Sequence, residues 1–267
     1  MAISVIVAVY KQIDPLELVF KGLDAQSFKD FEVILAEDDD APQTREFVRM
    51  RSAMGAFPVK HVFQEDIGFR KNRALNAALR IATAEAVVFL DADCIPHRHL
   101  LREYARRLKS EVALYGRRAM LSERLTAELL REGNIDRLTF RKLLLSGSRK
   151  VEDALYLPWL PARRHSEAGI WGCNWGILRK HLVDVNGFDE DYVKWGIGED
   201  ADIEWRLQAI GVALQSVKHK AITYHLYHGA HHEQATVSGN LELCRTKKQA
   251  GRSFCLNGLD KHGVALQ

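Results

Sequence analysis

The chain has 267 residues, of which 47% are hydrophobic and 27% are charged, and its formal net charge is +3 at pH 7. This composition is typical of a folded globular protein with a substantial core, built as one domain or two closely joined ones, and it excludes an intrinsically disordered chain. So small a net charge gives little support to nucleic-acid binding through bulk electrostatics, and we predict no nucleic-acid partner.

The first half of the chain alternates short apolar runs with segments of helical hydrophobic spacing. The expected strands cover residues 3–9, 31–36, 59–63 and 86–90, and the expected helices cover residues 15–26, 44–54 and 72–82. Alternating units of this size predict an α/β fold with a doubly wound, mostly parallel sheet. No G-x-G-x-x-G follows the first strand and no G-x-x-x-x-G-K-[ST] occurs, so an ordinary dinucleotide-binding fingerprint and a P-loop are both excluded.

The second half departs from this rhythm. Residues 121–145 have helical character, and residues 146–161 contain the Gly, Ser and Pro residues of an irregular binding loop or lid. Residues 179–185 predict a short helix that ends at Asn186-Gly187. Between Arg117 and His165, eleven Lys or Arg residues stand against six Asp or Glu. This excess predicts either a solvated helical surface or a basic face for an acidic substrate or a membrane surface.

The four cysteines show no C-x-x-C spacing, which fits a reducing compartment. The apolar N-terminus lacks a basic leader and predicts a buried strand instead of a signal peptide. No apolar run approaches the length of a membrane span. We therefore expect a cytoplasmic protein, and a peripheral position at the inner face of a membrane stays open.

Asp91 and Asp93 follow directly on the apolar run 86–90. A strand buried on both faces would bring both carboxylates to its carboxyl end, where open α/β sheets bind ligands. If the chain stays extended the two acids share a side, and hard oxygen ligands of this kind suit Mg²⁺ or Mn²⁺ carrying a phosphorylated substrate. The alternative is a surface turn with two solvated acids.

A second acidic pair follows Trp195-Gly196. Glu199 and Asp200 are expected in the first turn of an amphipathic helix with an apolar face formed by Ile203, Leu207 and Ile210. Acids in the first turn interact favourably with the helix dipole, so the two carboxylates could have a purely structural role. The dipole does not explain the tryptophan. An aromatic ring beside two carboxylates is what a sugar site needs, and one carboxylate can act as a general base.

Taken in order, these motifs resemble those of glycosyltransferase family 2, whose members have the GT-A fold, a Rossmann-like doubly wound sheet. The motifs are Val9-Tyr10, Glu37-Asp38-Asp39-Asp40, Gly68-Phe69-Arg70 with Arg73 and Asn76, Asp91-Ala92-Asp93, Gly172-Cys173-Asn174, Asn186-Gly187-Phe188-Asp189-Glu190 and Trp195-Gly196-x-Gly198-Glu199-Asp200. The second half is similar to the galactosyltransferase-type acceptor region of bacterial chondroitin-polymerase-like enzymes. The resemblance runs from Ile3 to about His232. At Glu37 to Asp40 the chain departs from the Asp-Asp-Gly-Ser of many relatives, which changes the turn and adds charge near the base.

The resemblance implies a set of residues around a UDP-sugar: Val9, Tyr10, Asp38, Arg70, Arg73, Asp91 and Asp93. Among these, Asp93 would be the main protein ligand of Mn²⁺ or Mg²⁺, and Asp91 would lie near the ribose and diphosphate. Arg70 and Arg73 are expected either to contact the diphosphate or only to line the following helix. The metal would act as a Lewis acid that offsets the charge growing on the departing diphosphate.

The resemblance also implies that Asp200 is the general base and that Glu199 binds sugar hydroxyls. The further substrate-binding residues are Trp195, Gly196, Trp171, Cys173, Asn174 and Asp202. Asp202 is expected either to support the two acids or to cap the helix. For Trp171 and Trp175 a buried aromatic core is the competing interpretation, and the one favoured.

Relatives commonly supply a histidine as a further metal ligand after a short strand, and here His225 and His228 are the candidates, with His231 and His232 nearby. If the strand persists, His225 and His228 point to opposite faces and at most one of them reaches the metal.

The implied activity is metal-dependent, inverting transfer of a hexose or N-acetylhexosamine from a UDP-sugar to a hydroxyl of a saccharide or lipid-linked saccharide, in surface polysaccharide biosynthesis. Residues 1–116 would bind the nucleotide sugar, residues 117–168 would form a basic helical and loop insertion that holds the acceptor, and residues 169–267 would bind the acceptor and catalyse. Two alternatives stay open: a sugar-phosphate nucleotidyltransferase, although no Gly-rich basic loop follows the first strand, and a non-catalytic carbohydrate-binding protein.

Overall fold

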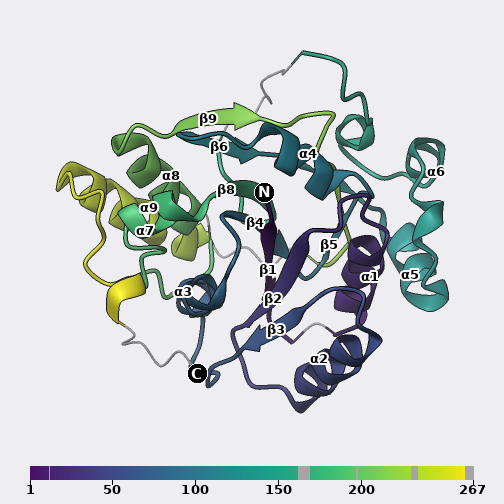
Figure 1. Cartoon of the computed structure of the whole chain (residues 1–267), viewed down its shortest axis with the longest axis horizontal. Coiled ribbons are helices and arrows are strands. Elements are labelled where there is room, and N and C mark those ends of the chain that lie inside the picture. The colour runs from purple at the N-terminus through teal and green to yellow at the C-terminus, as the bar shows by residue number, and fades with distance from the viewer. Residues whose placement is uncertain (12, 162–168, 197, 230–233, 262–267) are drawn as a thin grey trace.

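The computed structural model describes residues 1–11, 13–161, 169–196, 198–229 and 234–261. A seven-stranded sheet crosses the molecule in the order β3-β2-β1-β4-β8-β6-β9 (Figure 1). Its strands are β1 (Ile3–Val9), β2 (Phe31–Glu37), β3 (Val59–Val62), β4 (Ala86–Asp91), β6 (Val112–Tyr115), β8 (Asn174–Leu178) and β9 (Ala213–Ser216). The predicted strands of the first half begin at the observed residues and end within one residue of them. The α/β architecture predicted from the alternating pattern is therefore confirmed.

One strand of the sheet, β8, runs against all the others. Strands β3, β2, β1 and β4 are parallel, and β8 runs antiparallel to both β4 and β6. A second, three-stranded sheet consists of β5 (Cys94–Pro96), β10 (Thr223–His225) and β7 (Arg118–Met120), with β10 in the middle. Because β8 and β9 come from the expected acceptor-binding segment and share one sheet with β1 to β4, that segment is built into the same sheet as the first 116 residues.

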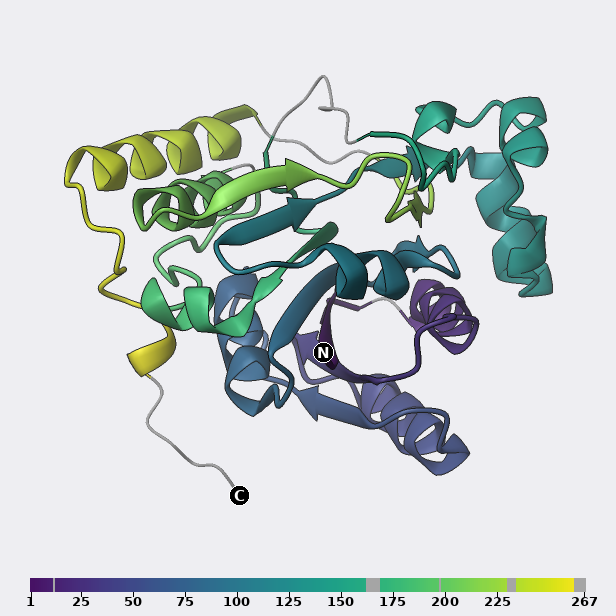
Figure 2. The same ribbon diagram turned by 45° about the horizontal axis from the view of Figure 1, so that its top comes forward.

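Helices cover both faces of the large sheet (Figures 1 and 2). The helices on one side are α1 (Ile13–Asp24), α2 (Pro42–Met54) and α4 (Leu100–Arg107), with α5 (Glu123–Glu132) packed on α1. Those on the other side are α3 (Lys71–Ile81), α7 (Arg179–Asp184) and α8 (Gly198–Ala209), with α9 (Gln234–Gln249) packed on α8. Of the described helices, none combines the length and the apolar character needed to cross a bilayer.

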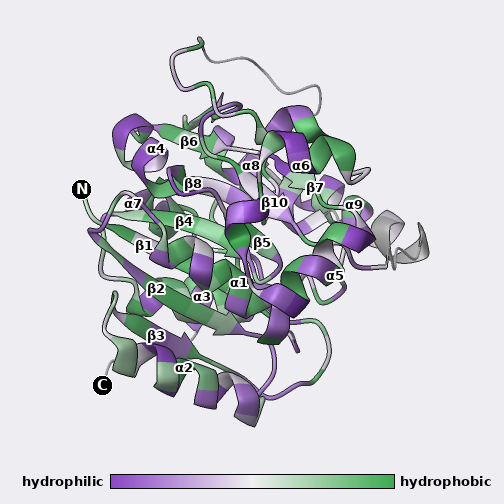
Figure 3. Cartoon of the chain, turned by 90° about the vertical axis from the view of Figure 1, so that its right-hand side faces the viewer, coloured by the Kyte–Doolittle hydropathy of each residue, from purple (hydrophilic) through white to green (hydrophobic). Residues whose placement is uncertain are grey.

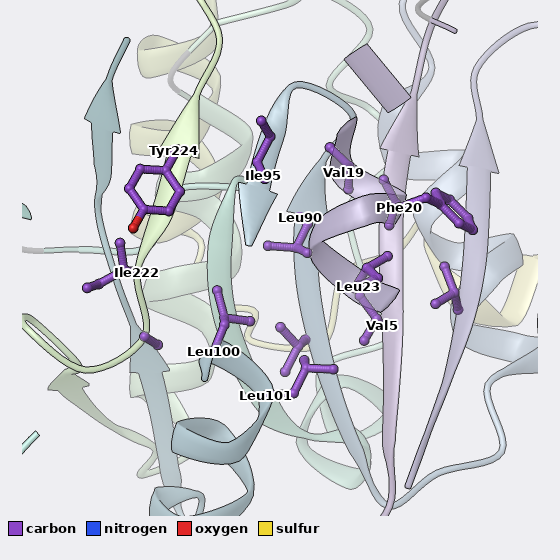
Figure 4. Close-up of a cluster of buried hydrophobic side chains, with 14 of the residues drawn as sticks. Val5, Val19, Phe20, Leu23, Leu90, Ile95, Leu100, Leu101, Ile222 and Tyr224 are labelled. Carbon is purple, nitrogen blue, oxygen red and sulfur yellow. The ribbon is translucent and has the colours of Figure 1, made fainter. Parts of the chain in front are cut away.

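Side chains of each central strand alternate between two cores. In β1, Val5 and Val7 belong to the core on the α1 side, shown in Figure 4, whereas Ile6 belongs to the core on the α3 side. Since both faces are buried, the central strands are mostly apolar, and Figure 3 shows β1 and β4 as mainly green. This is why the apolar runs predicted these strands so well.

Two expectations for the second half were wrong in detail. The helical stretch expected at 121–145 is divided into α5, a 3₁₀ turn (Ile135–Arg137) and α6 (Phe140–Leu145), because Gly133 adopts a positive φ of 63° and ends α5. Ile203 and Leu207 are buried as predicted, but α8 ends at Ala209 and Ile210 is 36% exposed. Residues 162–168, the end of the expected basic insertion, lie outside the described part of the chain.

The turn after α7 fixes the distance between α3 and α8. Asn186 and Gly187 both have a positive φ, and a Cβ on Gly187 would lie only 2.3 Å from Asn76 Oδ1 in α3. Asn76 donates from Nδ2 to the Phe188 carbonyl at 2.8 Å, and the Phe188 N–H donates back to Asn76 Oδ1 at 2.8 Å. The predicted glycine stop is therefore also a docking point, and it holds α3 beside the segment that leads into α8.

Glu32 makes stability depend on pH. It is 7% exposed and accepts hydrogen bonds from Ser4 at 2.6 Å and from the Thr83 N–H at 2.7 Å, and Lys60 Nζ lies 2.7 Å away. Burial by itself would raise the pKa of Glu32, but Lys60 and these hydrogen bonds lower it to about 2. The stabilisation is complete above the ordinary pKa of 4.5 and is lost as the pH falls through the folded value.

We therefore expect Glu32 to contribute roughly 3 kcal/mol to the free energy of unfolding near neutral pH. Glu32→Gln should lower that free energy at pH 7 and flatten its decline in acid, as measured by urea unfolding across the acidic range. The control is Glu65→Gln at an exposed carboxyl. A Glu32→Gln protein that loses stability in acid as steeply as the parent would contradict this account.

Candidate functional site

Three cavities meet at Trp195, which lines each of them. The first, the Tyr10 cavity, has a volume of about 410 Å³ and lies where β1, β2 and β4 end. It is lined by Ala8, Val9, Tyr10, Ala36, Asp38, Phe69, Lys71, Asp91, Ala92, Asp93 and Trp195. The carboxyl ends of parallel strands are where doubly wound sheets bind ligands, so this cavity has the position of a nucleotide site.

Asp38 is the fixed polar group of the Tyr10 cavity. Its carboxylate accepts hydrogen bonds from Gln64 Nε2 at 2.6 Å and from the Arg70 N–H at 2.7 Å. Burial raises the pKa of Asp38, and these hydrogen bonds oppose the rise. Val9, Tyr10 and Asp38 thus line one cavity, in agreement with where the sequence pattern put them.

The two arginines predicted at the diphosphate do not line the Tyr10 cavity. The Arg70 side chain donates to its neighbour's carbonyl, Phe69 O, at 2.8 Å, and Arg73 is exposed. Lys71 takes the cavity position instead, and the sequence reading missed it. Lys71 is the first residue of α3, and a cation in the first turn of a helix is unfavourable to the helix dipole. Its presence there therefore indicates a role other than helix stability.

The second, the Trp171 cavity, has a volume of about 690 Å³. It is lined by Lys71, Asp91, Arg118, Gly169, Ile170, Trp171, Gly172, Cys173, Trp195, Gly196, Glu199, Asp200, Ala201, Glu204, Trp205, Gln208, Cys244 and Lys248. Lys71, Asp91 and Trp195 line this cavity and the Tyr10 cavity, so the two open on each other across these residues. The expected pairing of tryptophans with two carboxylates is present here.

Lys71 is surrounded by acids. Its Nζ donates to Asp91 Oδ1 at 2.9 Å, and a Cβ on Gly172 would lie 3.1 Å from Lys71 Nζ and 3.4 Å from Asp200 Oδ1. Burial by itself would lower the pKa of Lys71, but Asp91, Asp200 and Glu199 raise it. The lysine is therefore charged at neutral pH and partly offsets the repulsion among three carboxyl groups.

Burial raises the pKa of both Glu199 and Asp200. Burial and then the Asp200 charge raise the pKa of Glu199 to about 8, so Glu199 carries a proton at pH 7. For Asp200, Lys71 and the Gly172 N–H, which donates to Asp200 Oδ2 at 2.9 Å, oppose the rise. Adjacent carboxyls in unlike surroundings are the arrangement of an acid and base pair.

Asp93 lies beside two imidazoles. Its Oδ2 is 3.4 Å from His225 Nε2 and 3.3 Å from His228 Nε2, and one ligand atom from each residue lies within 4.8 Å of the others. The condition under which only one histidine would reach the metal is not met, because β10 ends at His225 and the alternation of faces stops there. His231 and His232 lie outside the described residues.

The cluster of Asp93, His225 and His228 fits a divalent cation. Cis ligands of an octahedral ion at about 2.1 Å are roughly 3 Å apart, close to the observed separations. Burial lowers the pKa of His225 to about 4, so its ring is neutral, and its Nδ1 is buried without a hydrogen-bond partner. Burial would raise the pKa of Asp93, but the His228 hydrogen bond and nearby cations lower it to about 2. The Asp93 hydrogen bond raises the pKa of His228, so that ring must give up a proton to bind a metal, and a carboxylate with two imidazoles then suits Mn²⁺.

Asp91 and Asp93 do not act as a pair on one side. The chain turns at Ala92 and Asp93 before β5 begins, so Asp91 reaches Lys71 while Asp93 reaches the histidines. The alternation assumed for an extended chain fails because β4 ends at Asp91. As a result, Asp91 lines the Tyr10 and Trp171 cavities, whereas Asp93 belongs to the cluster with the two histidines.

The third, the His228 cavity, has a volume of about 830 Å³ and lies on the other side of Trp195. It is lined by Arg118, Met120, Leu121, Ser122, Glu123, Gly147, Arg149, Trp195, His225, Tyr227, His228 and Gly229. Arg118, which also lines the Trp171 cavity, was not singled out from the sequence because one arginine in a basic segment carries no distinguishing pattern. Burial would lower the pKa of Arg118, but Cys173, Cys94, Asp91 and Asp93 raise it.

Two predicted substrate residues have structural roles. Asn174 is fully buried, accepts from the Tyr104 hydroxyl at 2.8 Å and donates to the Arg117 carbonyl at 3.0 Å. Asp202 is 1% exposed and accepts from Arg206 Nε at 2.7 Å. Neither Asn174 nor Asp202 lines the Trp171 cavity, which Asp200 lines, because these hydrogen bonds hold both side chains in the core. Of the two roles expected for Asp202, the helix cap does not apply, because Asp202 lies within α8 and accepts hydrogen bonds from Tyr192, Trp205 and Arg206.

Trp171 and Trp175, for which a buried aromatic core was the favoured interpretation, have different environments. Trp175 is buried and stacks on Phe89 with ring centroids 4.5 Å apart, so the core interpretation is confirmed for it. Trp171 is half-buried, lines the Trp171 cavity and has the Arg117 guanidinium 4.2 Å from its ring centroid. Cys173 also lines this cavity, although it is 2% exposed. The core interpretation was therefore wrong for Trp171.

The chain belongs to glycosyl transferase family 2, because the model of that family matches residues 4–153. A second family model, described as the N-terminal domain of galactosyltransferase, matches residues 161–229. Validoxylamine A glucosyltransferase from Streptomyces hygroscopicus subsp. jinggangensis is 28% identical over 233 residues, covering 79% of this chain and 52% of the relative. An uncharacterized glycosyltransferase from Nostoc sp. is 24% identical over 94% of this chain and 72% of its own length. This chain thus spans about half the length of the validoxylamine relative.

Solved structures with the same fold are glycosyltransferases. The mannosyltransferase PcManGT from Pyrobaculum calidifontis, in complex with GDP-Man and Mn²⁺, has a TM-score of 0.56 at 21% identity and covers 84% of this chain and 56% of its own. TarS from S. aureus, in complex with UDP-GlcNAc, has a TM-score of 0.58 at 17% identity over 87% and 60%. GalNAc-T7, with UDP, GalNAc and Mn²⁺, has a TM-score of 0.65 at 13% identity over 92% and 48%. At these identities the likeness shows the fold, which is GT-A.

The histidine and aspartate cluster predicts a measurable metal affinity. Asp93→Ala and His225→Ala should each weaken Mn²⁺ binding, measured by calorimetry or by the electron spin resonance of free Mn²⁺. Removal of groups that only orient metal ligands costs about 10–100-fold, so loss of the Asp93 carboxylate should cost at least ~100-fold. The control is Asp66→Ala, an exposed acid outside the cluster. Unchanged Mn²⁺ affinity in Asp93→Ala would contradict the assignment.

Proposed function

We propose that this protein transfers a hexose or N-acetylhexosamine from a UDP-sugar to a saccharide hydroxyl with inversion at the anomeric carbon, in a reaction that depends on Mn²⁺ or Mg²⁺. The observation that carries the proposal is that Asp93 and Asp200 line adjoining cavities which share Lys71, Asp91 and Trp195. A donor in the Tyr10 cavity can therefore present its sugar to an acceptor in the Trp171 cavity.

The donor end of the proposal rests on the Tyr10 cavity. Val9 and Tyr10 offer apolar surface for a flat base, and Asp38 offers carboxylate oxygens to its N–H groups. The printed ligands of TarS and GalNAc-T7 include uridine nucleotides, whereas PcManGT was solved with GDP-Man. Uridine is our proposal for this chain, with Asp91 near the ribose and diphosphate.

Asp93, His225 and His228 would hold the metal. When bound there, the ion supplies positive charge to the diphosphate that leaves. Lys71 and Arg118 add fixed cations on either side of this cluster, because each lines two of the cavities that meet at Trp195. Both are charged at neutral pH, so they stabilise an anion in the site without any proton transfer.

Asp200 is the proposed general base. The Gly172 N–H donates to Asp200 Oδ2, and Lys71 favours the ionised carboxylate, so the acceptor hydroxyl can pass its proton to Asp200 while its oxygen attacks the anomeric carbon. Glu199, which carries a proton, can donate a hydrogen bond to a sugar oxygen. Trp171 and Trp195 offer faces for sugar rings, and Gly196 leaves room beside them.

The direct test is release of UDP from a panel of UDP-sugars, with and without Mn²⁺. Slow hydrolysis that needs the metal supports a transferase. Sugar binding that survives chelation, with no turnover of any donor, would instead indicate a carbohydrate-binding protein. Formation of a nucleotide sugar from a sugar phosphate and a nucleoside triphosphate would indicate a nucleotidyltransferase. Surface polysaccharide biosynthesis is our proposed setting, and the acceptors in the assay should include its saccharide intermediates.

Asp200→Asn should retain UDP binding while transfer falls by ~10²–10⁴, the usual contribution of a general base. Glu199→Gln is the matched control, because an amide resembles the protonated carboxyl that Glu199 has at pH 7, and its effect should be much smaller. Both variants are measured for UDP affinity and for transfer rate. Near-normal turnover in Asp200→Asn would remove it as the base.

Lys71→Met should change the pH dependence of transfer as well as its rate. Lys71 lowers the pKa of Asp200, so its removal raises that pKa, and the base becomes protonated at higher pH. The acidic limb of the rate profile should therefore move to higher pH, and the deficit relative to the parent should grow as the pH falls. Lys71→Arg should restore the profile in part. A uniform loss at every pH would show that Lys71 acts only through the diphosphate or the fold.

A further inference from the structure

Helix α6 presents apolar side chains to solvent. Phe140, Leu144 and Leu145 are 40%, 59% and 72% exposed, whereas Leu143 is fully buried. Residues at i, i+1, i+4 and i+5 lie on one side of a helix, so Phe140, Arg141, Leu144 and Leu145 form one surface, the α6 face. Leu143 points the other way and attaches the helix to the core.

The charge on the α6 face is uncompensated. Lys142 lies 2.9 Å from Glu128, and Arg137 lies 2.9 Å from Glu132, so these cations are neutralised on the inner side of the helical insertion. Arg141, by contrast, is exposed and makes no ion pair with any other residue that the structure describes. Apolar side chains grouped with a free cation match the boundary of an anionic bilayer.

The α6 face lies at an edge of the molecule and next to the site. Figures 1 and 2 show α5 and α6 at the margin of the fold, away from the large sheet. The chain that leaves α6 reaches Gly147 and Arg149, which line the His228 cavity. A surface that contacts α6 would therefore lie close to the cavity that holds His225 and His228.

We propose that the α6 face docks this protein on an anionic lipid bilayer. A second copy of the chain is a poorer occupant, since a stable protein interface buries about 800 Å² on each partner and α6 has six residues. Insertion into a bilayer needs only a few apolar side chains a short way below the headgroups, together with nearby cations. The docking extends the proposed function, because it brings a lipid-linked saccharide acceptor to the His228 cavity.

The test is co-sedimentation of the whole chain with vesicles of phosphatidylcholine alone and with vesicles that also contain phosphatidylglycerol. The parent should bind the anionic vesicles and release them at high salt. The double variant Leu144→Ser with Leu145→Ser, and the single variant Arg141→Glu, should each lower the bound fraction by on the order of tenfold. The matched controls are Met50→Ser with Met54→Ser, two exposed apolar residues of α2, and Lys109→Glu, an exposed cation elsewhere.

Metal-dependent UDP-sugar hydrolysis is measured on every variant, because the α6 face lines none of the three cavities. Loss of vesicle binding with hydrolysis retained supports the docking. Failure of the parent to bind anionic vesicles overturns it, and so does a parent dimer in solution that the leucine variants convert to monomers. If vesicle binding depends on α6 as expected but no variant and no parent hydrolyses any donor, the docking stands and the proposed transfer fails.

Discussion

The arrangement of the site depends on the positive charge of Lys71. Three carboxyl groups, Asp91, Glu199 and Asp200, come together where α3 and α8 begin, and without a cation their mutual repulsion would oppose folding. Lys71 bonds Asp91 directly and lies near Asp200, so it ties the end of β4 to the start of α8. Burial and then the Asp200 charge raise the pKa of Glu199 to about 8, so Glu199 is protonated at pH 7. Burial also raises the pKa of Asp200, and Lys71 opposes that rise, so the cation favours the ionised form of Asp200.

The second sheet separates the metal cluster from this acidic centre. The chain turns between β4 and β5, and β5 pairs with β10, so Asp93 and His225 meet through their strands while His228 approaches from the following loop. Trp195 lies where the cavities on both sides join. A donor and an acceptor can thus be held by different elements and still meet at one point. Transfer of a sugar requires this proximity of the two reactants. The α6 face adds a third element to this arrangement, since it is attached to the same three-stranded sheet through the bridge between Met120 and Arg149.

Several residues lie elsewhere in the structure than the sequence predicted, and tertiary contacts explain each of them. Asn174 and Asp202 are polar residues within motifs that resemble those of the family, yet both are buried and satisfied by internal hydrogen bonds that join distant segments. Lys71 was overlooked because two arginines flank it, and only the start of α3 decides which of the three side chains faces the cavities. His228 approaches Asp93 from the chain that follows β10, which ends at His225. The first two cases depend on hydrogen bonds between segments and the last two on where an element begins or ends, and local hydrophobic spacing defines neither well.

The sequence by itself determined the order and type of the elements in the first half, since strands buried on both faces must be apolar along their whole length and their helices must carry an apolar stripe. It also determined which residues follow the strand ends, and therefore that Val9, Tyr10, Asp38 and Asp91 share one edge of the sheet. Only the tertiary structure decided the antiparallel entry of β8, the three-stranded sheet that unites Asp93 with two histidines, and the burial that raises the pKa values of Glu199 and Asp200. These features arise from contacts between residues that are about 60 to about 130 positions apart, and such contacts leave no periodicity in the chain.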